Sequence, residues 1–426
     1  MNAQANPSIV REVLDNGLRI LTERMAHVRS ITIGVWLTRG SRHESAERSG
    51  IAHFVEHMLF KGTATRTAKD IAEAIDSIGG HLDAFTAKEY ASYHIKVLDE
   101  HLPLAIEILS DIVLNPAFSP EDIEREKKVI LEEIKMIEDA PDELVHELFT
   151  QAFWESHPLG RPILGVKETV ESFNADFLHD YFTKAYAAEN LIIAAVGNLE
   201  HERVRDLVAE KFGGLAKSGE PVHDEVPEVL PKILVRNKEL EQSHVCLGVG
   251  SYPQNHDSRY ACYALNTLLG ASMSSRLFQN VREKRGLAYA VFSGLNAYRD
   301  TGSFTVYAGC SNEAVGEVID LIVEELRGVK QEPVPDAELR RSKDHLKGSL
   351  MLSLESTSSR MHHLALQEIY FSRQFGLDET LEGIERVTAN QVQQVATDLF
   401  KNGSLAATVL GNVNGLHISR ERLDLD

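Results

Sequence analysis

Two histidines and a glutamate stand close together in the order His53-x-x-Glu56-His57. On a helix, residues four apart project from one face, so the two neutral imidazoles can hold a single Zn²⁺. Glu56 lies on the same side, where its carboxylate can reach a water molecule on the metal. The spacing therefore indicates hydrolytic chemistry, with this water as nucleophile and Glu56 as general base. An amphipathic helix that binds no metal is the alternative, and about 0.1 such patterns are expected by chance in a chain of this composition.

The residues around this motif predict the helix that carries it. Ser49 is a suitable N-cap and Gly62 a suitable residue after the C-terminus, which gives about three turns. Its apolar residues could form a core face with or without a metal: Ile51, Val55, Met58 and Leu59.

A catalytic zinc ion needs a third protein ligand, and a second predicted helix, from Pro120 to about Ile137, offers one. Its isoleucines form a narrow apolar stripe, and Glu126 and Glu133 lie two turns apart at the edge of that stripe. A carboxylate beside buried apolar residues is costly unless it has a partner. We therefore expect Glu133 to be the third ligand and Glu126 to support an imidazole from behind. A flanking salt bridge is the alternative for these carboxylates.

The sequence contains an internal repeat of low identity. An apolar segment closed by Gly-Asn occurs at 189–199 and again at 403–413, and each copy follows a predicted helix, at Ser172–Phe182 and Thr388–Phe400. The long helix that begins near Pro120 likewise has a counterpart that begins at Pro335. Such self-similarity indicates two related domains of the α+β class.

The segment between the repeats is rich in proline, glycine and charge, which is typical of a linker. We therefore expect domains at 1–217 and 232–426, joined by a linker at 218–231. Only the first domain can hold the metal, because Gly348 stands in the second at the place of Glu133. The places of the motif residues are likewise filled by other types: Tyr263, Asn266 and Thr267.

The motif, together with Glu133 in the segment 129–134, closely resembles the pitrilysin/insulinase-type metallopeptidases. The resemblance is strongest to the short branch that includes the mitochondrial processing peptidase β subunit and its bacterial relatives. It implies His53, His57 and Glu133 as zinc ligands, Glu56 as general base and Glu126 as an accessory carboxylate. It also implies two antiparallel sheets, each packed with helices, that face each other as a clam-shell around a closed chamber.

Two further segments are similar to the same family. Residues 79–90 resemble its substrate-binding edge strand, which implies that a peptide pairs with Asp83, Ala84, Phe85 and Thr86; the family usually has Asn in place of Asp83. Edge strands have free N–H and C=O groups that can pair with an extended peptide. Residues 281–289 resemble the family's Arg/Tyr segment. This implies that Arg282 and Tyr289 hold the substrate carbonyl and stabilise its oxyanion.

Composition limits the partners. The chain has 44 basic and 64 acidic residues, a net charge of −20, which disfavours nucleic acid and anionic membranes and favours basic peptides. The first eleven residues lack the pattern of a signal peptide and no apolar run could span a bilayer, so we expect a cytoplasmic protein. The three cysteines have no metal-site spacing, and we expect them to be buried.

The sequence thus predicts a zinc-dependent endopeptidase with one Zn²⁺ per chain. Because one chain carries both the metal motif and the Arg/Tyr segment, we expect a homodimer, or otherwise a heterodimer with a related chain. The alternative function is a non-catalytic core or scaffold subunit of the same fold that binds peptides.

Overall fold

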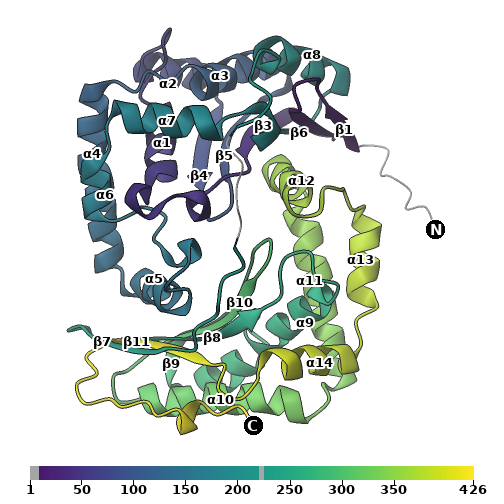
Figure 1. Ribbon diagram of the computed structural model, residues 1–426. Coiled ribbons are helices and arrows are strands. Elements are labelled where there is room, and N and C mark those ends of the chain that lie inside the picture. Colours follow the sequence, from purple (N-terminus) through teal and green to yellow (C-terminus); the bar gives the residue numbers. More distant parts are fainter. Residues whose placement is uncertain (1–8, 220–224) are drawn as a thin grey trace. The chain divides into compact units, whose positions relative to one another are not determined.

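The computed structural model describes residues 9–219 and 225–426, which divide into two compact units (Figure 1). Unit 1 contains residues 9–135, 161–219 and 353–376, and unit 2 contains residues 136–160, 225–352 and 377–426. Each unit is built on one sheet packed with helices, which confirms the predicted α+β class. Within the described ranges, no helix is long and apolar enough to cross a lipid bilayer.

The sheet of unit 1 has six strands in the order β1-β2-β6-β3-β5-β4. All neighbouring strands are antiparallel except β2 and β6. The sequence predicted an antiparallel sheet, but the structure has one parallel pair, because β6 follows a long helical segment and is not joined to β2 by a hairpin. The strands are β1 (Ile9–Val13), β2 (Arg19–Arg24), β3 (Ser30–Leu37), β4 (His81–Thr86), β5 (Ala91–Leu98) and β6 (Leu191–Gly197).

Helices cover both faces of this sheet. One face packs in the main core of unit 1, to which α1, α3 and α8 contribute, and the other face packs against α12. The helices wholly in this unit are α1 (Ile51–Leu59), α2 (Ala68–Asp76), α3 (Leu102–Leu114), α6 (Lys167–Ser172), α7 (Ala175–Ala185), α8 (His201–Phe212) and α12 (Thr357–Phe371). Helix α4 (Pro120–Asp139) begins in unit 1 and ends in unit 2.

The sheet of unit 2 has the order β7-β11-β8-β10-β9, and only the β7–β11 pair is parallel. This order and these directions repeat those of β2-β6-β3-β5-β4, as expected for an internal duplication. The strands are β7 (Ile233–Asn237), β8 (Ser243–Ser251), β9 (Ala288–Ala297), β10 (Gly302–Cys310) and β11 (Ala406–Gly411). The helices are α5 (Pro141–Phe153), α9 (Arg259–Leu269), α10 (Val315–Gln331), α11 (Asp336–Ser353, whose last residue belongs to unit 1), α13 (Leu377–Glu385) and α14 (Ala389–Leu399).

The compact units differ from the sequence repeats because each sheet is apolar on both faces and takes one covering helix from the other half of the chain. Helix α12 packs against β3 and β6 in unit 1, and α5 packs against β8 and β11 in unit 2 (Figure 1). Residues 220–224 of the predicted linker lie outside the described residues, and the rest of 218–231 has no helix or strand.

Most predicted elements are present, with shifted ends. The helix expected at Ser172–Phe182 is two helices, because α6 ends at Ser172 and α7 begins after Asn174, whose side chain caps it. The helix expected at Thr388–Phe400 is α14 (Ala389–Leu399), and Thr388 caps it by accepting a hydrogen bond from Gln391 N. All three cysteines are buried and free.

Candidate metal site

Helix α1 begins one residue later than predicted, and a carboxylate from the preceding loop caps it. Ser49 is not the N-cap; Gly50 is, with φ of 94°, a conformation that favours glycine. The Glu44 side chain, in the preceding loop, accepts hydrogen bonds from Gly50 N and Ala52 N, both at 2.8 Å. Glu44 therefore satisfies two N–H groups that the helix itself leaves unpaired, and it fixes the start of the helix that carries both histidines.

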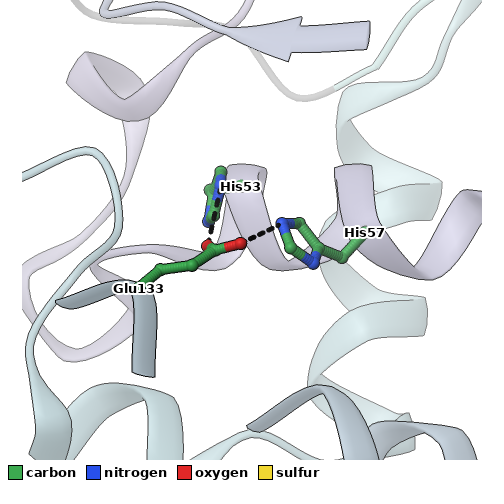
Figure 2. Close-up of side chains that lie close together, drawn as sticks. All are labelled: His53, His57 and Glu133. Atoms are coloured by element: carbon green, nitrogen blue, oxygen red, sulfur yellow. Dashed lines mark ion pairs between the residues drawn. The ribbon is translucent and has the colours of Figure 1, made fainter. Parts of the chain in front are cut away.

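The residues His53, His57 and Glu133 converge (Figure 2). Both imidazoles come from α1, and Glu133 comes from α4, with its carboxylate directed between them. His53 Nε2 lies 3.8 Å from Glu133 Oε2, and His57 Nε2 lies 3.6 Å from Glu133 Oε1. One ligand atom from each residue lies within 4.8 Å of the others. Among the described residues, no other group of three His, Cys, Asp or Glu side chains meets this criterion.

This donor set fits a zinc ion. Two imidazole nitrogens and one carboxylate oxygen are a known three-ligand set for zinc with an open fourth position. In a tetrahedral site, ligand atoms at about 2.0–2.1 Å from the ion are about 3.3 Å apart, close to the spacings observed here. The nitrogen–oxygen distances of 3.6 and 3.8 Å are too long for good hydrogen bonds, so neither imidazole forms a direct hydrogen bond with Glu133.

The two imidazoles have different surroundings. His57 Nδ1 donates to Glu126 Oε2 at 3.1 Å, which leaves Nε2 as the nitrogen that faces Glu133. His53 Nδ1 is buried and has no hydrogen-bond partner among the described residues. Burial, and secondly the neighbouring His57, lower the pKa of His53 to about 4. His53 is therefore a neutral imidazole at physiological pH, as metal coordination requires.

Glu56 is held by a residue of the neighbouring strand. Thr86, the last residue of β4, donates its hydroxyl to Glu56 Oε2, and Oε1 has no partner among the described residues. Burial raises the pKa of the Glu56 carboxyl, and the Thr86 hydroxyl opposes that shift because it bonds the carboxylate. A carboxylate with one oxygen anchored and one free can accept a proton in a defined position.

The predicted substrate-binding residues form most of β4, which lies at one end of the sheet and pairs with β5 on its other side. Thr86 faces Glu56, while Phe85 alternates to the other face and lies edge-on to Trp36. Asp83 is exposed and accepts a hydrogen bond from Ala84 N, so its side chain turns back onto its own strand. The backbone of β4 is thus placed at a sheet edge close to the general-base candidate.

Arg282 and Tyr289 belong to unit 2 and lie close to each other. The Arg282 guanidinium lies 5.5 Å from the Tyr289 ring and 4.7 Å from the Phe278 ring. Tyr289 is on the edge strand β9 and is 79% exposed. An exposed phenol beside a guanidinium is available to a ligand; that the two residues act on the substrate stays a prediction.

Three residues that support the site were not identified from the sequence: Glu44, Lys61 and Thr86 in its contact with Glu56. Lys61 and Thr86 lie within segments that were singled out, but nothing in their spacing points to their partners. Glu44 lies in an irregular loop without periodicity, so no sequence signal connects it to the start of α1.

Comparison with known proteins gives the family. Residues 19–167 match the family model described as insulinase (peptidase family M16), and residues 172–346 match the model described as peptidase M16 inactive domain. A protein of Bacillus subtilis named uncharacterized zinc protease YmxG is 43% identical over 392 residues, covering 92% of this chain and 96% of that protein. An uncharacterized zinc protease of Mycobacterium leprae is 40% identical over 414 residues, covering 96% and 93%. The chain therefore belongs to peptidase family M16.

Solved structures agree on the fold. The crystal structure of a protease from Helicobacter pylori matches with a TM-score of 0.88 at 23% identity, over 95% of this chain and 99% of that chain. The crystal structure of a peptidase M16 inactive domain from Pseudomonas fluorescens matches with a TM-score of 0.89 at 21% identity, over 95% and 98%. The predicted resemblance to pitrilysin/insulinase-type proteins is thus confirmed. The match of residues 172–346 to the inactive-domain model accords with Tyr263, Asn266 and Thr267 at the places of His53, Glu56 and His57.

Proposed function

We propose that this protein is a zinc-dependent endopeptidase in which His53, His57 and Glu133 hold one Zn²⁺ and Glu56 is the general base. The observation that carries the proposal is the convergence of two imidazole nitrogens and one carboxylate beside a second, anchored carboxylate. The names of the relatives, zinc protease, support the same assignment.

The side chains have distinct tasks in this proposal. When bound, a zinc ion would act as a Lewis acid toward a peptide carbonyl and would lower the pKa of a nearby water molecule. Glu56 Oε1 takes the proton of the attacking water and returns it to the leaving amine, while the Thr86 hydroxyl keeps Oε2 fixed. Glu126 orients His57 through Nδ1.

The peptide itself is bound by backbone pairing with β4 in this proposal. Asp83, Ala84, Phe85 and Thr86 supply the free edge, and an extended peptide adds one strand to the sheet. Arg282 and Tyr289 donate to the substrate carbonyl as its negative charge develops. The net charge of −20 favours basic peptides, and we propose a homodimer or a heterodimer with a related chain as the assembly.

Replacement of Glu56 tests the proposal. We expect Glu56→Gln to lower kcat/KM for a basic fluorogenic peptide by about 10²–10⁴-fold while the zinc content of the purified protein stays unchanged. Glu133→Gln should lose zinc as well as activity. Glu132→Gln is the matched control, because the Glu132 side chain is 69% exposed and pairs with Lys135. Wild-type turnover in Glu56→Gln would refute the mechanism, and peptide binding without turnover in the wild type would favour the scaffold alternative.

A further inference from the structure

A lysine that the peptidase mechanism does not use lies behind one of the metal-site histidines. Lys61 follows α1 and its C-cap, Phe60, and its Nζ lies 2.8 Å from Glu126 Oε1. The other oxygen of the same carboxylate, Oε2, accepts from His57 Nδ1 at 3.1 Å. The three side chains thus form a continuous series, Lys61–Glu126–His57, that ends at the imidazole facing Glu133.

The Glu126 carboxylate depends on this lysine because it is almost completely buried. Its side chain is 1% exposed, whereas that of Lys61 is 33% exposed. A buried carboxylate needs compensating charge and hydrogen bonds. In the described part of the chain, Lys61 is the one lysine or arginine with a nitrogen within 4 Å of Glu126. The lysine therefore supplies the positive charge that lets the carboxylate stay beside His57.

The position of Lys61 is itself fixed. Its backbone N–H donates to Met58 O at 3.1 Å, which continues the last turn of α1. The chain immediately after it is tied to α3, since Asp111 Oδ2 accepts from the hydroxyls of Thr63 and Thr65 and from Arg66. Two independent attachments therefore hold the lysine where its ammonium group meets Glu126.

We propose that Lys61 is a positioning residue for the metal site: it holds Glu126, and through Glu126 it holds the His57 ring with Nε2 toward Glu133. Without the ammonium group, the buried carboxylate would lose its main compensation and would turn toward another donor or toward solvent. His57 would then lose its only anchor at Nδ1 among the described residues. His53 cannot compensate for this loss, because its own Nδ1 has no partner in the same ranges.

The inference rests on the proposed function in one respect, namely that a divalent cation binds His53, His57 and Glu133. It is therefore tested by metal affinity, without any peptide. The zinc dissociation constant of the purified full chain is measured by competition with a chromophoric chelator. We expect Lys61→Met, which keeps the aliphatic stem, to weaken zinc binding by about 10-fold or more, and Lys61→Arg to restore affinity to within about threefold of wild type.

Lys135→Met is the matched control. Lys135 pairs with Glu132 at 2.7 Å on α4, but these side chains are 67% and 69% exposed, so we expect no change in zinc affinity. A double-mutant cycle separates positioning from general destabilisation. If Lys61 acts through Glu126, Lys61→Met should add little to the loss of zinc affinity already caused by Glu126→Gln. The absorption bands of the cobalt-substituted protein should change in Lys61→Met and recover in Lys61→Arg.

The possible results are distinct. Wild-type zinc affinity in Lys61→Met would overturn the inference and leave the proposed function intact. Equal, additive losses from Lys61→Met with and without Glu126→Gln would also overturn it, because the lysine would then act by another route. Failure of the wild type to bind zinc would refute the proposed function itself. If Lys61→Met does not fold, the same measurements on Lys61→Gln decide between these results.

Discussion

The capping of α1 by Glu44 predicts a measurable local destabilisation when this side chain is removed. Glu44 is 6% exposed, and each of its oxygens accepts one backbone N–H at 2.8 Å. In Glu44→Ala the donors Gly50 N and Ala52 N would remain buried without a partner. If each bond contributes only about 1 kcal/mol, the free energy of opening the start of α1 should fall by about 2 kcal/mol. The equilibrium constant for opening should then rise about 30-fold.

The pH dependence of this effect has a defined sign. Burial raises the pKa of the Glu44 carboxyl from its ordinary value of 4.5 to about 8, although the hydrogen bonds from Ala52 and Gly50 and the charge of Arg161 oppose the shift. The folded protein therefore binds this proton more tightly than the unfolded chain does. The resulting stabilisation is complete below about pH 4.5 and is lost as the pH rises through about 8. Glu44→Gln has no such titration, so its stability relative to wild type should improve across that range.

Hydrogen exchange followed by mass spectrometry measures the local opening directly, without assuming two-state unfolding of a two-unit chain. Peptides that cover residues 50–59 should exchange about 30-fold faster in Glu44→Ala than in wild type, for an opening cost lowered by about 2 kcal/mol. Glu47→Ala is the control, because Glu47 lies in the same loop and is exposed. Unchanged exchange of this segment in Glu44→Ala would refute the reasoning, and a parallel pH response in wild type and Glu44→Gln would refute the assigned direction of the pKa.

Two further predictions concern unit 1. Thr86→Val removes the hydroxyl that anchors Glu56, so kcat/KM should fall by about tenfold, the equivalent of one hydrogen bond to a charged group. The zinc content should stay at the wild-type level. A loss of zinc would show that Thr86 acts on the metal ligands instead. Burial lowers the pKa of His94 and also that of His362, and the two rings lie 5.3 Å apart. The neutral imidazoles therefore contribute stability that is complete above about pH 6.5. This stability is lost as the pH falls through the lowered pKa values. The melting temperature of wild type should therefore drop more between about pH 7.5 and 5.5 than that of the His94→Phe/His362→Phe variant, and equal drops would contradict the assignment.

The parts of the site that lie on regular helices could be predicted from the sequence. The period of 3.6 residues places His53 and His57 on one face of α1, and the same period places Glu126 and Glu133 at one edge of the apolar stripe of α4. The exposure of Glu132 follows from the same geometry, and its side chain is 69% exposed. These positions depend on local geometry, which a short stretch of sequence determines.

The supporting contacts could not be predicted in this way. Glu44 reaches α1 across an irregular loop, and Thr86 reaches Glu56 from a strand thirty positions along the chain. Both contacts depend on tertiary packing, and no periodic pattern specifies it. The start of α1 was misplaced for the same reason: a side-chain cap at Ser49 is the usual arrangement, but the fold supplies the cap from Glu44.

The covering helices show the same limit at a larger scale. The repeat correctly indicated two related sheets, because strand order is repeated within each half of the chain. It did not indicate that α12 packs on the sheet of unit 1 or α5 on that of unit 2, since both helices are amphipathic and either sheet offers them an apolar face. Sequence similarity between the halves therefore locates the duplication but not the exchange of helices.

The second copy of the site shows why, among the described residues, only the first half offers a donor set that could hold a metal. In α9, the Asn266 side chain and backbone oxygen both accept from Ser293 Oγ, and the Thr267 hydroxyl donates to Tyr263 O. These polar atoms are thus satisfied within unit 2, and Thr267 is 3% exposed. At the place of Glu133, Gly348 has no side chain, and a Cβ there would meet nothing within 4 Å. A glutamate at position 348 alone would therefore have room, but α9 (Arg259–Leu269) contains no histidine, so restoring the third ligand without the two histidines would not rebuild this donor set.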